Sequence, residues 1–145
     1  IYPTSLREEE GGTYGASAID NARREPKPSY MIQVVFQAKP AMADKLRDLA
    51  VEGFRRLAEE GPTAEEFNRT IENFKKNIPE NRIRNNYWQS DIISHYRFNG
   101  DRDGEWEAAV NALSASSIQA AAKALFNSGN FAEVVMKPGN TSEKE

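Results

Sequence analysis

The chain has 145 residues, of which 39% are hydrophobic and 28% are charged, a composition that fits one soluble globular domain. Its net charge of −3 gives no electrostatic reason to expect a nucleic acid or an anionic membrane as a partner. Cysteine is absent, which excludes disulfides and thiolate zinc sites, and the single histidine, His95, cannot build a zinc site alone. No apolar run approaches the roughly 20 residues that a transmembrane helix needs.

The two ends of the chain differ in character. The chain begins at Ile1, without a methionine or a signal-peptide pattern, and enters at once into what reads as a helix end over residues 5–10. We therefore expect the N-terminus to be a cut inside a larger polypeptide. Residues 139–145 are polar and turn-rich, so we expect one domain over residues 1–138 and a disordered C-terminal tail.

Two strands are predicted in the first quarter of the chain. Residues 13–20 alternate weakly between two faces, and residues 29–38 alternate clearly, as in a half-buried strand. The linker over residues 21–28 holds two prolines and four charges, so we expect a solvated loop there. The two strands would form an antiparallel hairpin with a long loop.

A run of helices follows. Pro40 opens a helix that ends at Gly61, and Thr63 with Glu66 forms a capping-box pattern at the start of the next. Pro79 lacks an N–H, so we expect it to kink or restart this second helix. An apolar face continues from there to residue 100. On this stretch we expect Tyr87 and Trp88 to be core or interface residues and His95 to be a plain helix residue.

The last elements complete the predicted fold class. Asp103 is placed to cap a short helix, and Ser114 is placed to cap another that stops near Gly129. Residues 131–136 read as a final strand. Widely separated strands around a run of helices predict an α+β fold, with an antiparallel sheet packed on helices.

Arg7 and Tyr14 are the candidate site residues. Arg7 ends the helix-like stretch, Tyr14 lies in the first predicted strand, and the glycines at positions 11 and 12 make the turn between them. The guanidinium stays charged and the phenol stays neutral at pH 7, and both can donate hydrogen bonds to a developing oxyanion. From the residues alone, an ordinary arginine at a helix end and an ordinary tyrosine in a strand remain the simpler interpretation.

The segments around this pair resemble a known family. Residues 6–18 are similar to the start of the conserved half of a C-terminal domain in the insulinase and pitrilysin family, the inverzincin metallopeptidases related to mitochondrial processing peptidase. Further similar segments follow in the family's order over nearly the whole chain: residues 61–67, 85–88, 113–119 and 134–138.

The resemblance implies one part of a closed chamber. In that family, two halves of similar α+β domains close like a clamshell over an unfolded peptide, so this chain would be part of one half. An H-x-x-E-H motif and a downstream glutamate in the first domain bind zinc, and the motif glutamate activates water. The other half supplies an arginine and a tyrosine that bind the substrate backbone and support the oxyanion. Arg7 and Tyr14 match these catalytic positions, and Gly12 and Thr13 lie in the same substrate-binding segment.

The chain departs from a whole enzyme because it has no H-x-x-E-H motif and no second histidine. We expect none of its residues to bind zinc and the isolated chain to be inactive. The resemblance places the zinc on an N-terminal domain, in the same parent chain or in a partner subunit. It also suggests the periplasm as compartment, since bacterial relatives are often periplasmic.

Two alternatives remain open at this point. The chain could be a non-catalytic scaffold or partner subunit of the same superfold, because fold alone does not decide function. It could also be an independent peptide-binding module whose strand over residues 13–19 pairs with an extended peptide. An intact H-x-x-E-H in the parent or in a partner chain would separate the enzyme from the scaffold.

Overall fold

The computed structural model describes residues 13–137 and confirms the α+β fold class. The expected helix end over residues 5–10 and the expected tail over residues 139–145 lie outside the described residues. No helix within the described range is long and apolar enough to cross a membrane. The elements run in this order: β1 (Thr13–Arg23), β2 (Ser29–Ala38), the 3₁₀ turn η1 (Pro40–Met42), α2 (Ala43–Glu60), α3 (Ala64–Arg82), α4 (Asn85–Phe98), α5 (Arg102–Ala112) and α6 (Ala115–Asn127).

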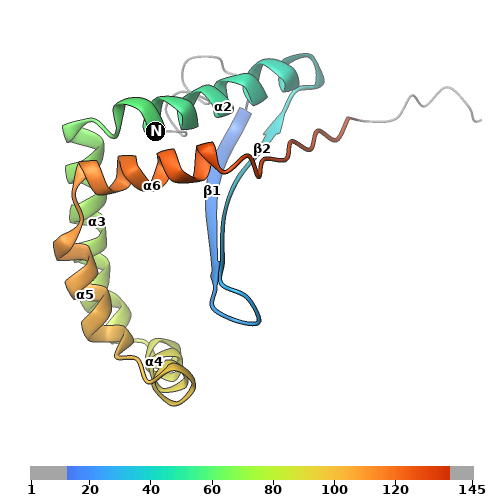
Figure 1. Cartoon of the computed structure of the whole chain (residues 1–145). Coiled ribbons are helices and arrows are strands. Elements are labelled where there is room, and N and C mark those ends of the chain that lie inside the picture. The colour runs from blue at the N-terminus through green and yellow to red at the C-terminus, as the bar shows by residue number, and fades with distance from the viewer. Residues whose placement is uncertain (1–12, 138–145) are drawn as a thin grey trace, which may run out of the picture. The chain divides into compact units, whose positions relative to one another are not determined.

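The predicted antiparallel hairpin is confirmed, with a shorter loop than expected (Figure 1). β1 continues to Arg23, which pairs with Ser29, so the first residues of the predicted linker belong to the strand. The loop therefore covers only residues 24–28. Ladder hydrogen bonds use only backbone groups, so the polar residues at the end of β1 can extend the strand without a buried face.

Helix α2 packs on the hairpin through a small apolar core. Leu46 and Ala50 on α2 are buried, at 0% and 8% exposure. The residues packed against them are Ala16, Val34, Phe36, Ala38, Met42 and Leu49. The half-buried pattern predicted for β2 therefore holds from Val34 onward, whereas Tyr30 on the same face is 51% exposed because the core cluster does not reach it.

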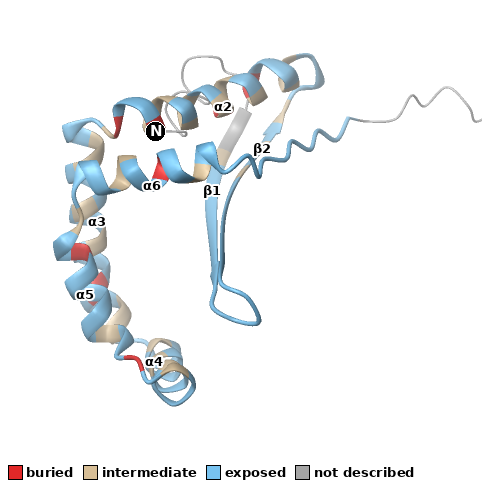
Figure 2. Ribbon diagram, in the orientation of Figure 1, coloured by how far each residue is buried: buried red, intermediate tan, exposed pale blue. Residues whose placement is uncertain are grey.

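The described residues divide into two compact units. One contains the hairpin, most of α2 and the chain from Leu125 onward, and the other runs from Ala58 to Ala124. The second unit buries Ile78 of α3 and Val110 of α5, and the ring of Phe74 meets the ring of Trp106 edge-on. Buried positions are few along each helix, as Figure 2 shows.

The start of α3 confirms the predicted capping box. The Thr63 side chain accepts a hydrogen bond from the Glu66 backbone N–H at 3.2 Å, and the Glu66 carboxylate accepts one from the Thr63 N–H at 2.9 Å. Gly61, with φ of +80°, ends α2 just before it. Of the two predicted effects of Pro79, a kink or a restart, the restart does not occur, because α3 runs through Pro79 to Arg82. Pro79 is exposed, so water can satisfy the carbonyl that its missing N–H leaves free.

Two further details of the helix caps differ in outcome. The N-cap of α5 is Asp101, whose carboxylate accepts a hydrogen bond from the Gly104 N–H at 3.0 Å, and not Asp103 as predicted. Asp103 lies in the first turn of α5, where its carboxylate is free to bind groups from other helices. The predicted Ser114 cap is confirmed, because its Oγ accepts a hydrogen bond from the Ser117 N–H at 3.1 Å.

The predicted final strand over residues 131–136 is absent, since the described residues from 129 to 137 form neither helix nor strand. A strand needs a partner for its backbone groups, and this segment contacts a helix instead. Glu133 forms an ion pair with Arg47 of α2 at 3.3 Å, and Lys137 forms one with Asp44 at 3.1 Å. Met136, an apolar residue of the expected strand, is 93% exposed.

Candidate functional site

The predicted site pair lies at the border of the described region. Arg7 and Gly12 fall outside the described residues, so their positions relative to β1 stay a prediction. The backbones of Thr13 and Tyr14 lie in β1, as the alternation predicted. The second strand of the hairpin therefore holds the segment that carries Tyr14 through backbone pairing.

A β-bulge interrupts the hairpin at Tyr14. Thr13 pairs with Ala38, and the next pair along the ladder joins Ala16 to Phe36. Two residues of β1, Tyr14 and Gly15, thus stand against one residue of β2. Bulges break the alternation of faces and re-aim a side chain, and they are over-represented next to active sites.

The described residues do not fit a zinc site. Within residues 13–137, no group of three or more histidine, cysteine, aspartate or glutamate side chains could hold a metal ion. His95 lies in α4, where its carbonyl accepts the N–H of Asn99 at 2.9 Å. Its ring lies edge-on to the ring of Tyr96, with centres 5.4 Å apart, and the sequence predicted a plain helix residue here.

The strongest polar cluster centres on Asp103, which the sequence analysis read only as a cap. Arg82 of α3 donates two hydrogen bonds to this carboxylate, at 2.8 and 2.9 Å, and a third to Glu107 at 2.7 Å. The Tyr87 hydroxyl of α4 donates to Asp103 at 2.5 Å, and Asp91 accepts a hydrogen bond from the Asp103 N–H at 3.1 Å. The Asp103 cluster, defined by these five residues, joins α3, α4 and α5.

The cluster shifts the titration of its members. The hydrogen bonds from Arg82 and then Tyr87 lower the pKa of Asp103 below its usual value. The bond to Asp103 raises the pKa of Tyr87, with burial as the next cause. The pKa of Arg82 is raised, first by its bond to Asp103 and then by its bond to Glu107. No local sequence pattern predicts this cluster, because Arg82 and Asp103 are 21 positions apart in the sequence.

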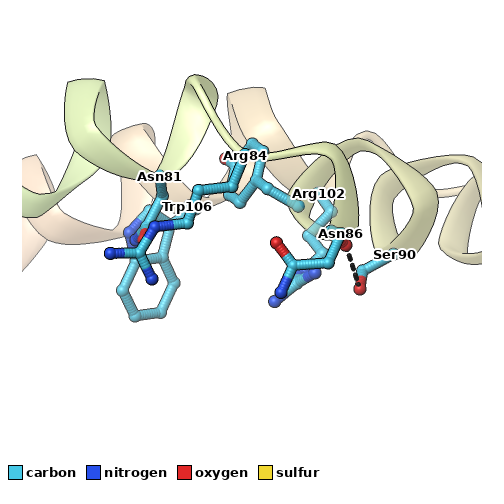
Figure 3. Close-up of a pocket in the computed structure, with 7 residues that line it drawn as sticks. Asn81, Arg84, Asn86, Ser90, Arg102 and Trp106 are labelled. Carbon is cyan, nitrogen blue, oxygen red and sulfur yellow. Dashed lines mark hydrogen bonds between the residues drawn. The ribbon is translucent and has the colours of Figure 1, made fainter.

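A pocket of about 260 Å³ lies beside the Asp103 cluster, in the same unit. The ring of Tyr87, an expected core or interface residue, forms part of its wall, whereas Trp88 is 42% exposed and donates through its indole N–H to the Arg82 carbonyl. The sequence analysis identified no pocket here. Figure 3 labels the other lining residues: Asn81, Arg84, Asn86, Ser90, Arg102 and Trp106.

Comparison with known proteins places these features in a family context. Residues 4–74, which include Arg7 and Tyr14, match the family model described as the Peptidase M16 inactive domain. No curated protein matches the sequence. The fold is similar to the crystal structure of the periplasmic protease PqqL from Escherichia coli, with a TM-score of 0.64 and 19% sequence identity. That match covers 84% of this chain and 14% of PqqL, so the chain spans about one seventh of that protein.

Proposed function

Because this chain is a C-terminal domain of the M16, or insulinase, peptidase family, we propose that it holds the peptide substrate of a zinc metalloendopeptidase. The observation that carries the proposal is the β-bulge at Tyr14 and Gly15, inside the segment that matches the family model. The bulge interrupts regular strand pairing at the position where the family resemblance puts a substrate-binding tyrosine, and bulges are over-represented next to active sites.

The proposed roles follow from the chemistry of the two side chains. The Arg7 guanidinium keeps its charge and the Tyr14 phenol keeps its proton at pH 7, so both can donate to a peptide carbonyl that gains negative charge. Gly12 and Thr13 lie in the same segment, and their backbone N–H and C=O groups would form hydrogen bonds with an extended peptide. The proposed domain extends over residues 1–138.

The metal belongs elsewhere in this proposal. Residues 13–137 do not fit a zinc site, so the zinc would be held by an N-terminal domain of the parent chain or by a partner subunit. The unfolded peptide would then lie between that domain and this one. The description of the matching model as an inactive domain agrees with a chain that holds substrate and no metal.

The test is cleavage of a quenched peptide library by the full-length parent and its variants. We expect Arg7→Ala and Tyr14→Phe to lower kcat/KM by about 10²–10³ while the zinc content stays unchanged, as for other oxyanion donors. Tyr30→Phe is the matched control, since it removes the same hydroxyl from an exposed position of the same hairpin. Unchanged kcat/KM in Tyr14→Phe and Arg7→Ala would contradict the proposed roles.

The description of the family model as an inactive domain agrees equally well with the scaffold alternative. A parent that binds no zinc and cleaves nothing, with every co-purifying subunit present, would favour the scaffold. Cleavage that a chelator abolishes would favour the enzyme.

For the compartment we propose the periplasm, because the solved protein with the similar fold is a periplasmic protease. Fractionation of the source cells checks this: the parent should appear with the periplasmic proteins, and its retention with the cytosolic fraction would contradict the proposal.

A further inference from the structure

The pocket beside the Asp103 cluster is lined by hydrogen-bond donors. Two arginines, two asparagines and the indole of Trp106 bring N–H donors to its lining, and no lining side chain carries a carboxylate. The hydroxyls of Tyr87 and Ser90 also line it, but they already donate to Asp103 and to the Asn86 carbonyl. Figure 3 shows Asn86, Arg102 and Trp106 projecting to the same side of the helices, with Arg84 on the adjoining loop. A surface of this composition complements a group that only accepts hydrogen bonds.

The two arginines of the pocket are available for an external anion. The carboxylates of the Asp103 cluster are already engaged, because Asp103 and Glu107 bind Arg82 and Asp91 accepts the Asp103 N–H. Neither Arg84 nor Arg102 forms an ion pair with any residue in the part of the chain that the structure describes. Elsewhere on these helices, arginines such as Arg69 do pair with a carboxylate.

Other contacts hold the pocket walls in place. The Trp106 ring packs edge-on against Phe74, with ring centres 5.7 Å apart. Tyr87 is anchored through its hydroxyl to Asp103, and the guanidinium carbon of Arg102 lies 5.7 Å from the centre of the Tyr87 ring. Walls that are ordered before binding lower the entropy that a ligand must overcome.

The size of the pocket limits its ligand. At about 260 Å³ it falls below the range of roughly 300–1,000 Å³ that is usual for pockets that take drug-sized molecules. A single charged group fits better than a nucleotide or an organic cofactor. Guanidinium forks match the geometry of carboxylate and phosphate oxygens, and both groups accept several hydrogen bonds at once.

We propose that this pocket binds a small oxyanion, a carboxylate or a phosphate. Arg84 and Arg102 supply the positive charge, and the side-chain amide of Asn86 supplies a neutral donor, whereas the Ser90 hydroxyl already donates to the Asn86 carbonyl at 2.9 Å. The proposal goes beyond substrate holding by Arg7 and Tyr14, and neither of those residues contributes to it.

Isothermal titration calorimetry on the full-length protein tests the proposal with two oxyanion probes, inorganic phosphate and N-acetylglycine. N-Acetylglycinamide, which lacks the carboxylate, is the uncharged counterpart. We expect saturable binding of at least one oxyanion and none of the amide. Binding of phosphate alone would identify a phosphate group as the ligand, and binding of N-acetylglycine alone would identify a carboxylate. Failure of both oxyanions to bind saturably at millimolar concentration would overturn the proposal.

Arg84→Gln and Arg102→Gln localise the binding. Each should weaken it about tenfold, since a hydrogen bond to a charged group is lost. Arg69→Gln removes the same charge from α3 outside the pocket and should bind like the wild type. Arg84 is exposed, and its side chain forms no hydrogen bond or ion pair with the described residues, so Arg84→Gln should test the site without unfolding it. Wild-type affinity in both pocket variants, or an equal loss in Arg69→Gln, would overturn the proposal.

Discussion

At the scale of single residues, Asp103 joins three helices. Its carboxylate accepts hydrogen bonds from Arg82 and Tyr87, and its backbone N–H donates to Asp91. Its side chain retains 21% exposure, so the cluster is partly screened by solvent. The consequence is local: Asp103 holds the first turn of α5 against the end of α3 and the start of α4.

Asp103→Asn should loosen this junction. The asparagine side chain has nearly the same volume as aspartate but carries no charge. One of the two carboxylate oxygens is replaced by an NH2 group, which cannot accept the hydrogen bonds that Arg82 and Tyr87 donate. We expect faster hydrogen exchange of the backbone amides of α5, by several-fold, in the full-length protein. Glu105→Gln removes a charge from the same helix where the carboxylate has no partner within the described residues, and it should leave exchange unchanged. Equal exchange in the two variants would contradict the role of Asp103.

Acid should release the same junction in the wild type. The pKa of Asp103 is lowered in the folded state by its bonds to Arg82 and Tyr87, from an unfolded value of about 3.9. The folded state thus favours the carboxylate, so the stabilisation is complete above the unfolded pKa and is lost as the pH falls through the folded pKa. We expect the protection of α5 amides, corrected for intrinsic exchange, to fall in this acid range. Asp103→Asn should show a smaller fall, and an equal fall would contradict the assignment.

At the scale of elements, the hairpin depends on α2. A two-stranded hairpin is marginal on its own in water, and this one gains an apolar face from Leu46 and its neighbours. The bulge lies at the covered end of the hairpin, since Ala16 and Ala38 on either side of it pack on the same cluster. Packing by α2 therefore also supports the strand segment that carries Tyr14.

Leu46→Ala should destabilise the hairpin and α2 together. Leu46 is fully buried, at 0% exposure, and removing a buried leucine side chain costs about 2–5 kcal/mol. Hydrogen exchange measures the free energy of opening at each backbone amide, and this value should fall for the amides of β2 and α2. Val134→Ala, in the same unit at 85% exposure, is the control and should change little. A loss in Leu46→Ala no larger than in Val134→Ala would show that this contact does not stabilise the hairpin.

At the scale of the whole molecule, the proposed function makes this chain one part of a larger functional unit. It spans about one seventh of the length of PqqL, and its described residues do not fit a metal site. The proposed peptidase chemistry therefore requires residues from another domain. The oxyanion pocket differs in this respect, because all of its lining residues lie in one compact unit of this chain.

The isolated chain should accordingly bind no stoichiometric zinc and cleave no peptide. Metal analysis after dialysis and a fluorogenic peptide assay measure both quantities. The full-length parent, assayed with and without a chelator, is the positive control. Stoichiometric zinc together with chelator-sensitive cleavage in the isolated chain would contradict the proposed division of roles.

The sequence by itself determined the local elements and the family. Hairpin, helices and capping box were predictable because they depend on alternation, helical spacing and side-chain caps between near neighbours. The resemblance around Arg7 and Tyr14 identified the family for the same reason, since it rests on a contiguous motif. Two local predictions failed where a distant partner decides the outcome: the Asp103 cap and the final strand over residues 131–136.

Only the tertiary structure decided which distant residues meet. Asp103 binds Arg82, 21 positions earlier, in place of capping its own helix, and residues 131–136 find ion-pair partners on α2 in place of a strand to pair with. The bulge at Tyr14 and the pocket between Arg84 and Arg102 likewise depend on register and on the approach of separate helices. Such contacts involve residues far apart in sequence, and their free energy appears only when the chain has folded, so no local pattern encodes them.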